Sequence, residues 1–390
     1  MNQGQTVFSQ IMHYLPTRRF ATCVKRYNGN AYAKHLTCLD QFKIMALGQL
    51  TRCDSLRDIV TCLKAVRPRL YHLGISHCAP RSTLADANER RPWRIYADLA
   101  TVLIRHATDL YRNEDLGEEL NGLRLYACDA SMIDLCLAQF PWAPYQRSKG
   151  AVKLHTLLNL RGNIPTFIDI THGKVNDVPG LDMLTIEPGA YYIMDRGYLD
   201  FRRLYRVKQS LGFFITRTKK NTKFSRRYSQ PIDKSTGLRC DQTIILTGAY
   251  TPTYYPEPLR RIKYRDPQTD KTLVFLTNDF ELPALVIAQL YKMRWQVELF
   301  FKWIKQHLRI KRFYGHSDNA VKTQIWIAVA TYLLVSILRK ELGIEARLYE
   351  ILQFLSKAIF EKAPINEFFW PTDSIRLEAI SYNQLALFEL

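Results

Sequence analysis

The sequence predicts an α/β fold: a mixed sheet with flanking helices, interrupted by a β-rich insertion, with helical regions at both ends of the chain. Apolar residues recur at helical spacing near both ends, short apolar or alternating runs fill the centre, and a basic, alternating stretch precedes the last helices. A chain of 390 residues can form two or three domains with a sizeable core. The expected regions are 1–115, 120–217, 218–275, 276–315 and 316–390.

The first region, residues 1–115, is expected to be helical. Ser55 is the expected N-cap of one helix, with Asp58 at its third helical position, and another helix starts at Ser82 and ends at Pro92. The region carries 17 Lys or Arg and 9 Asp or Glu residues, a net charge near +8. These features fit a DNA-binding module, and they fit any small helical bundle equally well. The expected helices cover 39–50, 55–63, 82–92 and 94–111.

After an acidic linker at 113–122, the second region has the pattern of strands. The run YYIMD at 191–195 is nearly continuous in apolar residues, which favours a strand covered on both faces. Three strands in a meander, then a strand, a helix and a strand, indicate an α/β core whose last strands are connected by helices. The expected strands cover 123–129, 152–160, 164–173, 191–195 and 212–219, with a helix at 199–211.

The third region, 218–275, is polar and basic and then alternates like antiparallel strands. Between residues 201 and 275 there are 17 Lys or Arg and 5 Asp or Glu, or +12 in one segment. Beyond residue 315 the chain is expected to be helical. The apolar run 325–338 is 14 residues long, shorter than the roughly 20 that a membrane span needs, so a buried helix is expected there. The expected strands of the third region cover 241–250, 259–266 and 271–279.

Charge and cysteine content narrow the class of protein. The formal net charge of +19 and pI near 9.6 favour a polyanionic partner, and nucleic acid is a better candidate than a membrane surface. The eight cysteines form no CxxC pair and no metal-finger spacing with histidine, so reduced, mostly buried thiols are expected. The N-terminus lacks the pattern of a signal peptide. A cytoplasmic protein without a membrane partner is expected.

The helix predicted over residues 291–308 places Tyr291, Arg294, Glu298 and Lys305 within an arc of roughly 60°, with Lys302 beside it. An adjacent apolar stripe anchors this helix, and its two tryptophans, 295 and 303, are expected to pack. For an arbitrary helix, the arc would be a solvated face with an Arg294–Glu298 salt bridge. The alternative is that the lone glutamate has a separate function.

Two aspartates upstream give this glutamate a possible function. Asp129 and Asp195 are each the last residue of an expected strand, where a sheet presents side chains to an edge cleft. Three carboxylates that converge from separate elements could hold Mg²⁺, and two-metal phosphoryl transfer requires such convergence. Taken alone, an aspartate at a strand end is more often a turn or capping residue. Spacing does not exclude the competing aspartates 134, 169, 177 and 182.

The spacing Tyr291, Arg294, Glu298 and Lys305 resembles the YREK signature of the IS4 family of bacterial DDE transposases. CDASMIDL around Asp129 and MDRGY around the second aspartate resemble the two aspartate motifs of that family, in the expected order. The resemblance covers most of the chain, and it implies a bacterial, nucleoid-associated protein. It implies an N-terminal DNA-binding domain, a ribonuclease H-like catalytic core in two parts, a β insertion and a helical C-terminal region with a possible dimerisation role.

The resemblance also implies residue roles. Asp129, Asp195 and Glu298 would be the catalytic triad and would bind two divalent ions, Mg²⁺ or Mn²⁺. The reaction would be cleavage of phosphodiesters and strand transfer on double-stranded DNA. Its substrates would be the terminal inverted repeats and the target DNA. The active form would be a homodimer that holds two paired ends. Residues expected to contact DNA are Tyr291, Arg294, Lys305, Lys302, Arg196 and Tyr198.

Some features leave alternatives open. Relatives that cut through a DNA hairpin stack a flipped base on a tryptophan of the insertion, and residues 218–275 contain no tryptophan. Tyr250, Tyr254 or Tyr255 could supply an aromatic face instead. A metal-dependent nuclease or resolvase with the same core would cut DNA without joining it. A non-catalytic DNA-binding protein derived from a transposase would bind DNA only.

Overall fold

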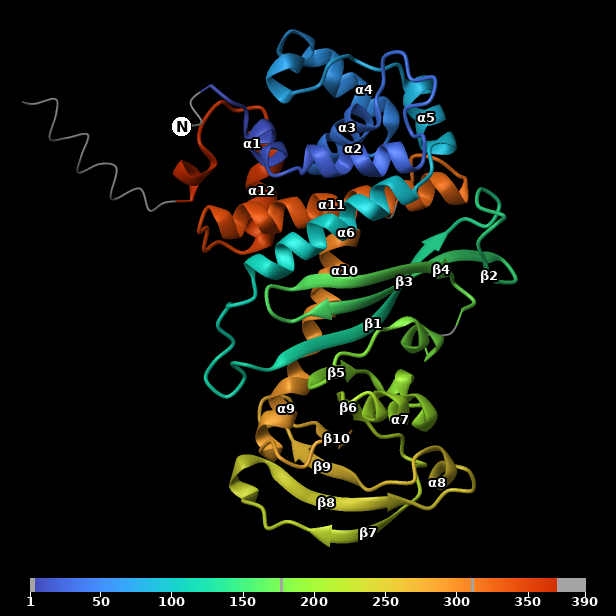
Figure 1. The fold of residues 1–390 in the computed structure, drawn as a ribbon, viewed down its shortest axis with the longest axis vertical. Coiled ribbons are helices and arrows are strands. Elements are labelled where there is room, and N and C mark those ends of the chain that lie inside the picture. Colours follow the sequence, from blue (N-terminus) through green and yellow to red (C-terminus); the bar gives the residue numbers. More distant parts are fainter. Residues whose placement is uncertain (1–3, 176–177, 309, 311, 370–390) are drawn as a thin grey trace, which may run out of the picture. The chain divides into compact units, whose positions relative to one another are not determined.

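The structure, a computed structural model, describes residues 4–175, 178–308, 310 and 312–369 (Figure 1). The chain forms two compact units. The helical unit contains the described residues within 1–103, 306–315 and 319–390, and the sheet unit contains 104–305 and 316–318. The first and last parts of the described chain therefore fold into one unit, and the central part folds into the other.

The helical unit has the elements that the periodicity predicts. Ser55 caps α4 by accepting a hydrogen bond from the Asp58 backbone N–H, as expected, and Thr37 with Asp40 forms a capping box on α3. Ser82 is not a cap, because α5 begins one residue earlier, after Pro80. The helices are α1 (Val7–His13), α2 (Thr17–Arg26), α3 (Cys38–Leu50), α4 (Leu56–Ala65), η1 (Arg67–Leu73), α5 (Arg81–Arg90), α6 (Arg94–Leu110), α11 (Asp318–Glu341), α12 (Leu348–Ala358) and η5 (Ile365–Phe368).

The long helix α11 is the core helix expected from its apolar sequence. Among the described helices it alone is long and apolar enough to span a membrane, and 94% of its most apolar window is buried inside the protein. Ile325, Leu333 and Leu338, which span the expected apolar run, are each fully buried. A helix that is apolar and buried all round belongs to a protein core, so the prediction of a buried helix is confirmed.

The sheet unit is built on one ten-stranded mixed sheet. The expected meander is present, since β1 pairs antiparallel with β3 and β3 with β4. The strands are β1 (Arg124–Leu135), β2 (Pro144–Gln146), β3 (Lys149–Asn159), β4 (Ile164–His172), β5 (Ala190–Met194), β6 (Phe213–Arg217), β7 (Phe224–Ser229), β8 (Leu238–Leu246), β9 (Leu259–Arg265) and β10 (Thr272–Thr277). The helices are η2 (Val178–Met183), η3 (Arg196–Tyr198), α7 (Phe201–Gln209), η4 (Lys234–Thr236), α8 (Thr251–Tyr254), α9 (Ala284–Met293) and α10 (Trp295–His307).

The strands of the basic region extend the same sheet. The order is β2-β3-β1-β5-β6-β10-β9-β8-β7, with β4 paired to β3 (Figure 1). Only β1, β5 and β6 are parallel to one another, and helix α7 connects the last two of them. Strand β7, which the sequence did not predict, lies at the edge with every residue exposed. Its cations Arg226 and Arg227 and a bulge protect that edge against pairing with another strand.

Alternation of side chains divides the sheet into two covered faces. On one face, Tyr192 and Phe214 lie in a hydrophobic cluster with Leu204 and Val207 of α7. On the other face, the ring of Tyr291 from α9 lies 5.0 Å from that of Phe275 on β10. A strand covered on both sides explains why β5 is apolar throughout.

Three further expectations about the fold need correction. Asp129 does not end a strand, because β1 runs on to Leu135 along its long antiparallel partner β3. The helix expected over 291–308 is two helices that meet at Arg294, where i→i+3 backbone bonds tighten the turn. The cysteines are all free, but only Cys23, Cys38 and Cys128 are buried.

Candidate active site

Parallel pairing brings Asp129 and Asp195 together. The last register partners of β1 and β5 are Cys128 and Met194; Asp129 is the next residue of β1, and Asp195 directly follows β5. Neighbouring strands lie about 4.8 Å apart, and the two side chains leave the sheet on the same face. They point to the face that α9 covers, because the alternate residues Cys128 and Met194 lie in the cluster under α7.

The junction of α9 and α10 supplies the next side chains. Tyr291 is the third-last residue of α9, Arg294 lies at the junction, and Glu298 is in the first turn of α10. Val297, Phe300 and Ile304 of α10 are almost completely buried, which fixes the orientation of the helix. The hydroxyl of Tyr291 donates to Oδ1 of Asp195 at 3.3 Å.

Arg294 connects two of the carboxylates. Its Nη1 donates to Oδ2 of Asp129 at 3.3 Å, and its Nη2 donates to Oε1 of Glu298 at 2.5 Å. The salt bridge that the helical spacing predicts is therefore present, but the same guanidinium also reaches β1. Its buried Nε–H has no acceptor among the described residues. The side chain as a whole is 14% exposed, so its spare donor can bind a further anionic oxygen once the guanidinium moves to uncover it.

Arg217 is a site residue that the sequence analysis missed. It ends β6 two positions after Ile215, the register partner of Ile193, so it lies level with Asp195. Its Nη2 is 3.8 Å from Oδ1 of Asp195, and its guanidinium lies 6.0 Å from the centre of the Tyr291 ring. Asp129, Asp195 and Arg217 thus form a row across three adjacent parallel strands. Its position near the end of the strand expected over 212–219, after an apolar run, was the available signal.

The other residues expected to contact DNA lie in different surroundings from one another. Nζ of Lys305 donates to Oγ of Ser131 at 2.6 Å and to the carbonyl of Met132. These residues follow Asp129 on β1, so Lys305 lies beside that carboxylate. Lys302 and Arg196 are exposed. Tyr198 is not brought to the carboxylates: it is 2% exposed and lies in the cluster under α7, where the 3-10 turn η3 after β5 places it.

The electrostatics of Asp129 show that negative charge is concentrated at the site. The pKa of this carboxyl is raised to about 6, mainly by burial, with smaller contributions from the negative charges of Glu298 and Asp195. The backbone N–H of Ala130 and the guanidinium of Arg294 act in the opposite direction. The three carboxylates are close enough to repel one another, and a nearby cation lowers that repulsion.

The donor set fits a hard divalent cation in its chemistry. All three candidates are carboxylates, and their side chains are 20% (Asp129), 38% (Asp195) and 31% (Glu298) exposed, so oxygens remain open. Within the part of the chain that the structure describes, no three Asp, Glu, His or Cys side chains are close enough to form a ready ligand set. Arg294 bridges Asp129 and Glu298 instead. Binding of a cation to all three would require this guanidinium to move.

Of the competing acids that the structure describes, one is held by arginines and two lie elsewhere on the sheet. Asp182 accepts hydrogen bonds from Arg203 and Arg206, Asp134 is exposed on β1, and Asp169 lies on β4, away from the row of charges. Residue 177 lies outside the described residues.

Aromatic residues of the insertion and of α10 divide by exposure. Tyr255 is completely buried and so offers no face to a base, whereas Tyr250 is 71% exposed and stacks on Tyr254 at 6.5 Å. Trp303 packs in the core as expected. The packing expected for Trp295 is wrong, because its side chain is 56% exposed.

Comparison with known proteins identifies the family. The model of the transposase DDE domain matches residues 121–334, which include every carboxylate of the site. The chain belongs to the DDE transposase family. A domain of unknown function, DUF4372, matches residues 3–76 of this transposase.

Three curated relatives of the chain are also described as transposases. A protein named as a transposase, y4zB, of Sinorhizobium fredii is 33% identical over 78% of this chain and 85% of its own length. A protein described as a transposase for the insertion sequence element IS5377 of Geobacillus stearothermophilus is 28% identical over 54% of this chain and 55% of its own. A protein named for the element IS4SA of Synechocystis is 23% identical over 88% of this chain and 95% of its own.

The transposase is therefore an enzyme of an insertion sequence that cleaves DNA and transfers strands. Its mixed α/β fold agrees with the ribonuclease H-like core expected from the resemblance. Dependence on divalent metal is general in DDE transposases, and the oxygen donors described above are suited to it.

Proposed function

We propose that Asp129, Asp195 and Glu298 are the catalytic acids of this transposase and hold two divalent ions, Mg²⁺ or Mn²⁺. The observation that carries the proposal is the parallel register, which places the two aspartates side by side 66 residues apart in sequence. The guanidinium of Arg294 donates to both the first carboxylate, Asp129, and the third, Glu298, and so joins them. When bound, the ions would activate the attacking oxygen, water first and then a 3′ hydroxyl, and offset charge on the phosphodiester.

The other residues of the site bind and orient the DNA backbone. Arg294 offers its spare Nε–H, and its planar fork suits a phosphate. Arg217 and the hydroxyl of Tyr291 approach Asp195 from the neighbouring strand and from α9, so they hold the phosphate on that side. Lys305, Lys302 and Arg196 add positive charge around it. The DNA-facing role is not extended to Tyr198, because its ring is in the core.

We further propose roles for the regions outside the site. Residues 1–115 bind the terminal inverted repeats, 218–275 forms the insertion that contacts DNA through its exposed cations, and 316–390 contributes to a homodimer on two paired ends. The excess of +12 in residues 201–275 supports the second role. Of the three candidate tyrosines of the insertion, Tyr250 is the most exposed and is the one that can stack on a flipped base. The protein acts in the bacterial cytoplasm, where its DNA substrate lies.

The replacement Glu298→Gln tests the catalytic assignment. It removes a charge but keeps the size of the side chain and an oxygen that can accept from Arg294. We expect Mg²⁺-dependent cleavage of an inverted-repeat duplex to fall at least about 100-fold, while binding of that duplex changes little. Gel analysis of labelled strands and fluorescence anisotropy measure the two effects.

Asp134→Asn is the matched control, because Asp134 is an exposed acid on β1 that faces away from the three carboxylates. It should cleave and join like the unmodified protein. Normal cleavage by Glu298→Gln would show that the acids have been assigned wrongly.

A further inference from the structure

One segment of the helical unit combines strain, exposure and charge in a way that the fold alone does not require. Tyr32, in the loop between α2 and α3, has its side chain fully exposed, with a relative accessibility of 102%. Its backbone is in the left-handed region, with φ of 60°. A bulky residue rarely adopts that conformation, and glycine or asparagine would adopt it at lower cost. Backbone strain of this kind is retained mainly at functional positions.

The loop that carries Tyr32 is held rigidly. A Cβ on Gly29 would lie 2.4 Å from Cδ1 of Ile95, so the loop packs directly against α6. Oδ1 of Asn30 accepts a hydrogen bond of 2.8 Å from the backbone N–H of Cys38, the first residue of α3. Arg91 donates to the carbonyl of Leu36 and, at 2.8 Å, to Oε1 of Gln41. A rigid loop that projects an aromatic ring loses little entropy when the ring is bound.

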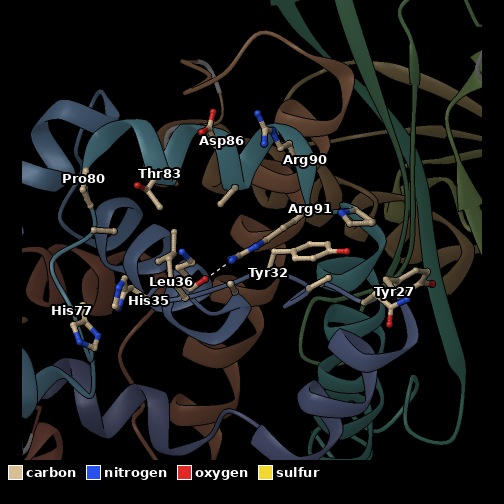
Figure 2. Close-up of a pocket in the computed structure, with 18 of the residues that line it drawn as sticks. Tyr27, Tyr32, His35, Leu36, His77, Pro80, Thr83, Asp86, Arg90 and Arg91 are labelled. Carbon is tan, nitrogen blue, oxygen red and sulfur yellow. Dashed lines mark hydrogen bonds between the residues drawn. The ribbon is translucent and has the colours of Figure 1, made fainter.

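A pocket of about 990 Å³ lies between this loop and helix α5 (Figure 2). Its walls come from the loop, from the segment before α5 and from α5 itself. The lining includes three Lys or Arg residues and one acid, so its charge is positive. The charged and imidazole side chains of the lining are Lys34, His35, His77, Asp86, Arg90 and Arg91.

An exposed aromatic ring beside exposed cations matches the chemistry of DNA. Lys34 and Arg90 are exposed and can approach phosphates, while the ring of Tyr32 can lie against a base. The charge near +8 over residues 1–115 favours a polyanion over a neutral partner. A second copy of this chain would have to cover these cations and carries the same net positive charge.

We infer that the pocket at Tyr32 is the DNA-contact surface of the helical unit, with Tyr32 placed against a base and Lys34 and Arg90 against the adjoining phosphates. The inference rests on the proposed function, since the DNA is taken to be the terminal inverted repeat of the element. It assigns a role to a surface formed partly by the domain of unknown function at residues 3–76. It does not depend on which residues carry out cleavage.

Tyr32→Ala tests this inference, with a fluorescein-labelled duplex of the inverted repeat that flanks the reading frame as the probe. In the absence of metal, anisotropy should show affinity weakened by between about 5-fold and about 100-fold. Tyr32→Trp should keep most of the affinity, because stacking tolerates different rings. Tyr71→Ala is the control, since Tyr71 is 87% exposed in the same unit but does not line the pocket. Equal affinities of Tyr32→Ala and Tyr71→Ala would overturn the inference.

Tyr32→Gly separates a contact role from a role in folding. Glycine relieves the left-handed backbone, so this variant should melt at the same or a higher temperature and still lose affinity. Retained affinity in this stable variant would overturn the inference.

The phosphate contacts of Lys34 and Arg90 are tested separately, through the salt dependence of DNA binding. Lys34→Ala with Arg90→Ala should make the slope of log affinity against log salt shallower by roughly 1 to 2, because up to two phosphate contacts are lost. The control pair Arg57→Ala with Lys64→Ala, exposed on α4, should leave that slope unchanged. An unchanged slope in the first pair would contradict the phosphate contacts.

Three further outcomes decide between this surface and its rivals. If Tyr32→Ala dissociates a DNA-free oligomer in sedimentation, the surface is an interface between copies, and the inference is wrong. If Tyr32→Ala binds normally while Glu298→Gln cannot cleave, the inference fails and the proposed catalytic function stands. If Tyr32→Ala loses binding while Glu298→Gln cleaves normally, the surface is supported and the catalytic assignment fails.

Discussion

Two arginines of the sheet unit, Arg260 and Arg294, differ in how completely their donors are paired with acceptors in the protein. Arg260 on β9 forms a bidentate pair with Asp241 at 2.9 and 2.7 Å, and both side chains are more than 90% buried. Its Nη1 also donates to the carbonyl of Leu282 at 2.6 Å. Arg294 gives one hydrogen bond to each of two acids that remain partly open to solvent, and its Nε–H has no acceptor among the described residues.

The difference separates a structural ion pair from a site. The donors of Arg260 are satisfied within the protein, so nothing is left for a ligand, and its removal would leave a buried, uncompensated charge. Arg294 has unused hydrogen-bonding capacity and joins carboxylates that repel one another. A charged group that the fold leaves incompletely satisfied is a candidate for binding a substrate.

The largest effect on stability is expected from Arg260→Leu. Breaking a buried pair by removing one partner costs about 3–5 kcal/mol, so the melting temperature should fall by many degrees. Thermal unfolding followed by circular dichroism measures the change. Arg265→Ala is the control: its pair with Asp270 is exposed, and its loss should leave the melting temperature unchanged. A stable Arg260→Leu variant would remove the distinction between the two arginines.

Arg294→Ala should have a smaller effect on stability and a large effect on cleavage. The melting temperature should fall less than for Arg260→Leu, because the acids that lose their partner remain open to water. Single-turnover cleavage should fall about 100-fold to 1,000-fold if the arginine stabilises charge on the phosphodiester. Arg294→Lys should recover only part of the rate, since an ammonium cannot reproduce the planar fork. Cleavage at the normal rate by the alanine variant would make Arg294 a structural residue after all.

Arg217→Ala should give the smallest of these effects. The guanidinium is 3.8 Å from Asp195 and 30% exposed, so it acts through a weaker and partly screened contact. We expect cleavage at low DNA concentration to fall about 10-fold, with partial recovery in Arg217→Lys. Rates measured against DNA concentration separate weaker binding from slower chemistry. No change in either would exclude this residue from the site.

The sequence predicted most of the elements because their signals are local. Periodicity located the helices α3, α4 and α6 and the strands of the meander, and polar caps such as Ser55 marked helix starts. It missed β7, since the composition of that strand is basic and every side chain is exposed, which leaves no apolar alternation to detect. It also joined α9 and α10, because the turn at Arg294 contains no glycine or proline to mark it.

The candidate site was predicted less completely. The spacing of Tyr291, Arg294 and Glu298 could be read from the chain because neighbouring turns of helix bring them together. Arg217 could not be identified, since its relation to Asp195 depends on which strands pair and in which register. Tyr198 was misplaced for a related reason, because the turn after β5 directs it into the core.

What the sequence by itself determined is therefore the set of elements, the charge and the family signature, all of which depend on residues near one another in the chain. Tertiary structure alone decided that Asp129 and Asp195 are adjacent, that one arginine serves two carboxylates, and that Tyr32 projects into solvent from a strained, rigid loop. These features arise from which strands pair and from packing between segments far apart in the chain, so no short stretch of sequence shows them.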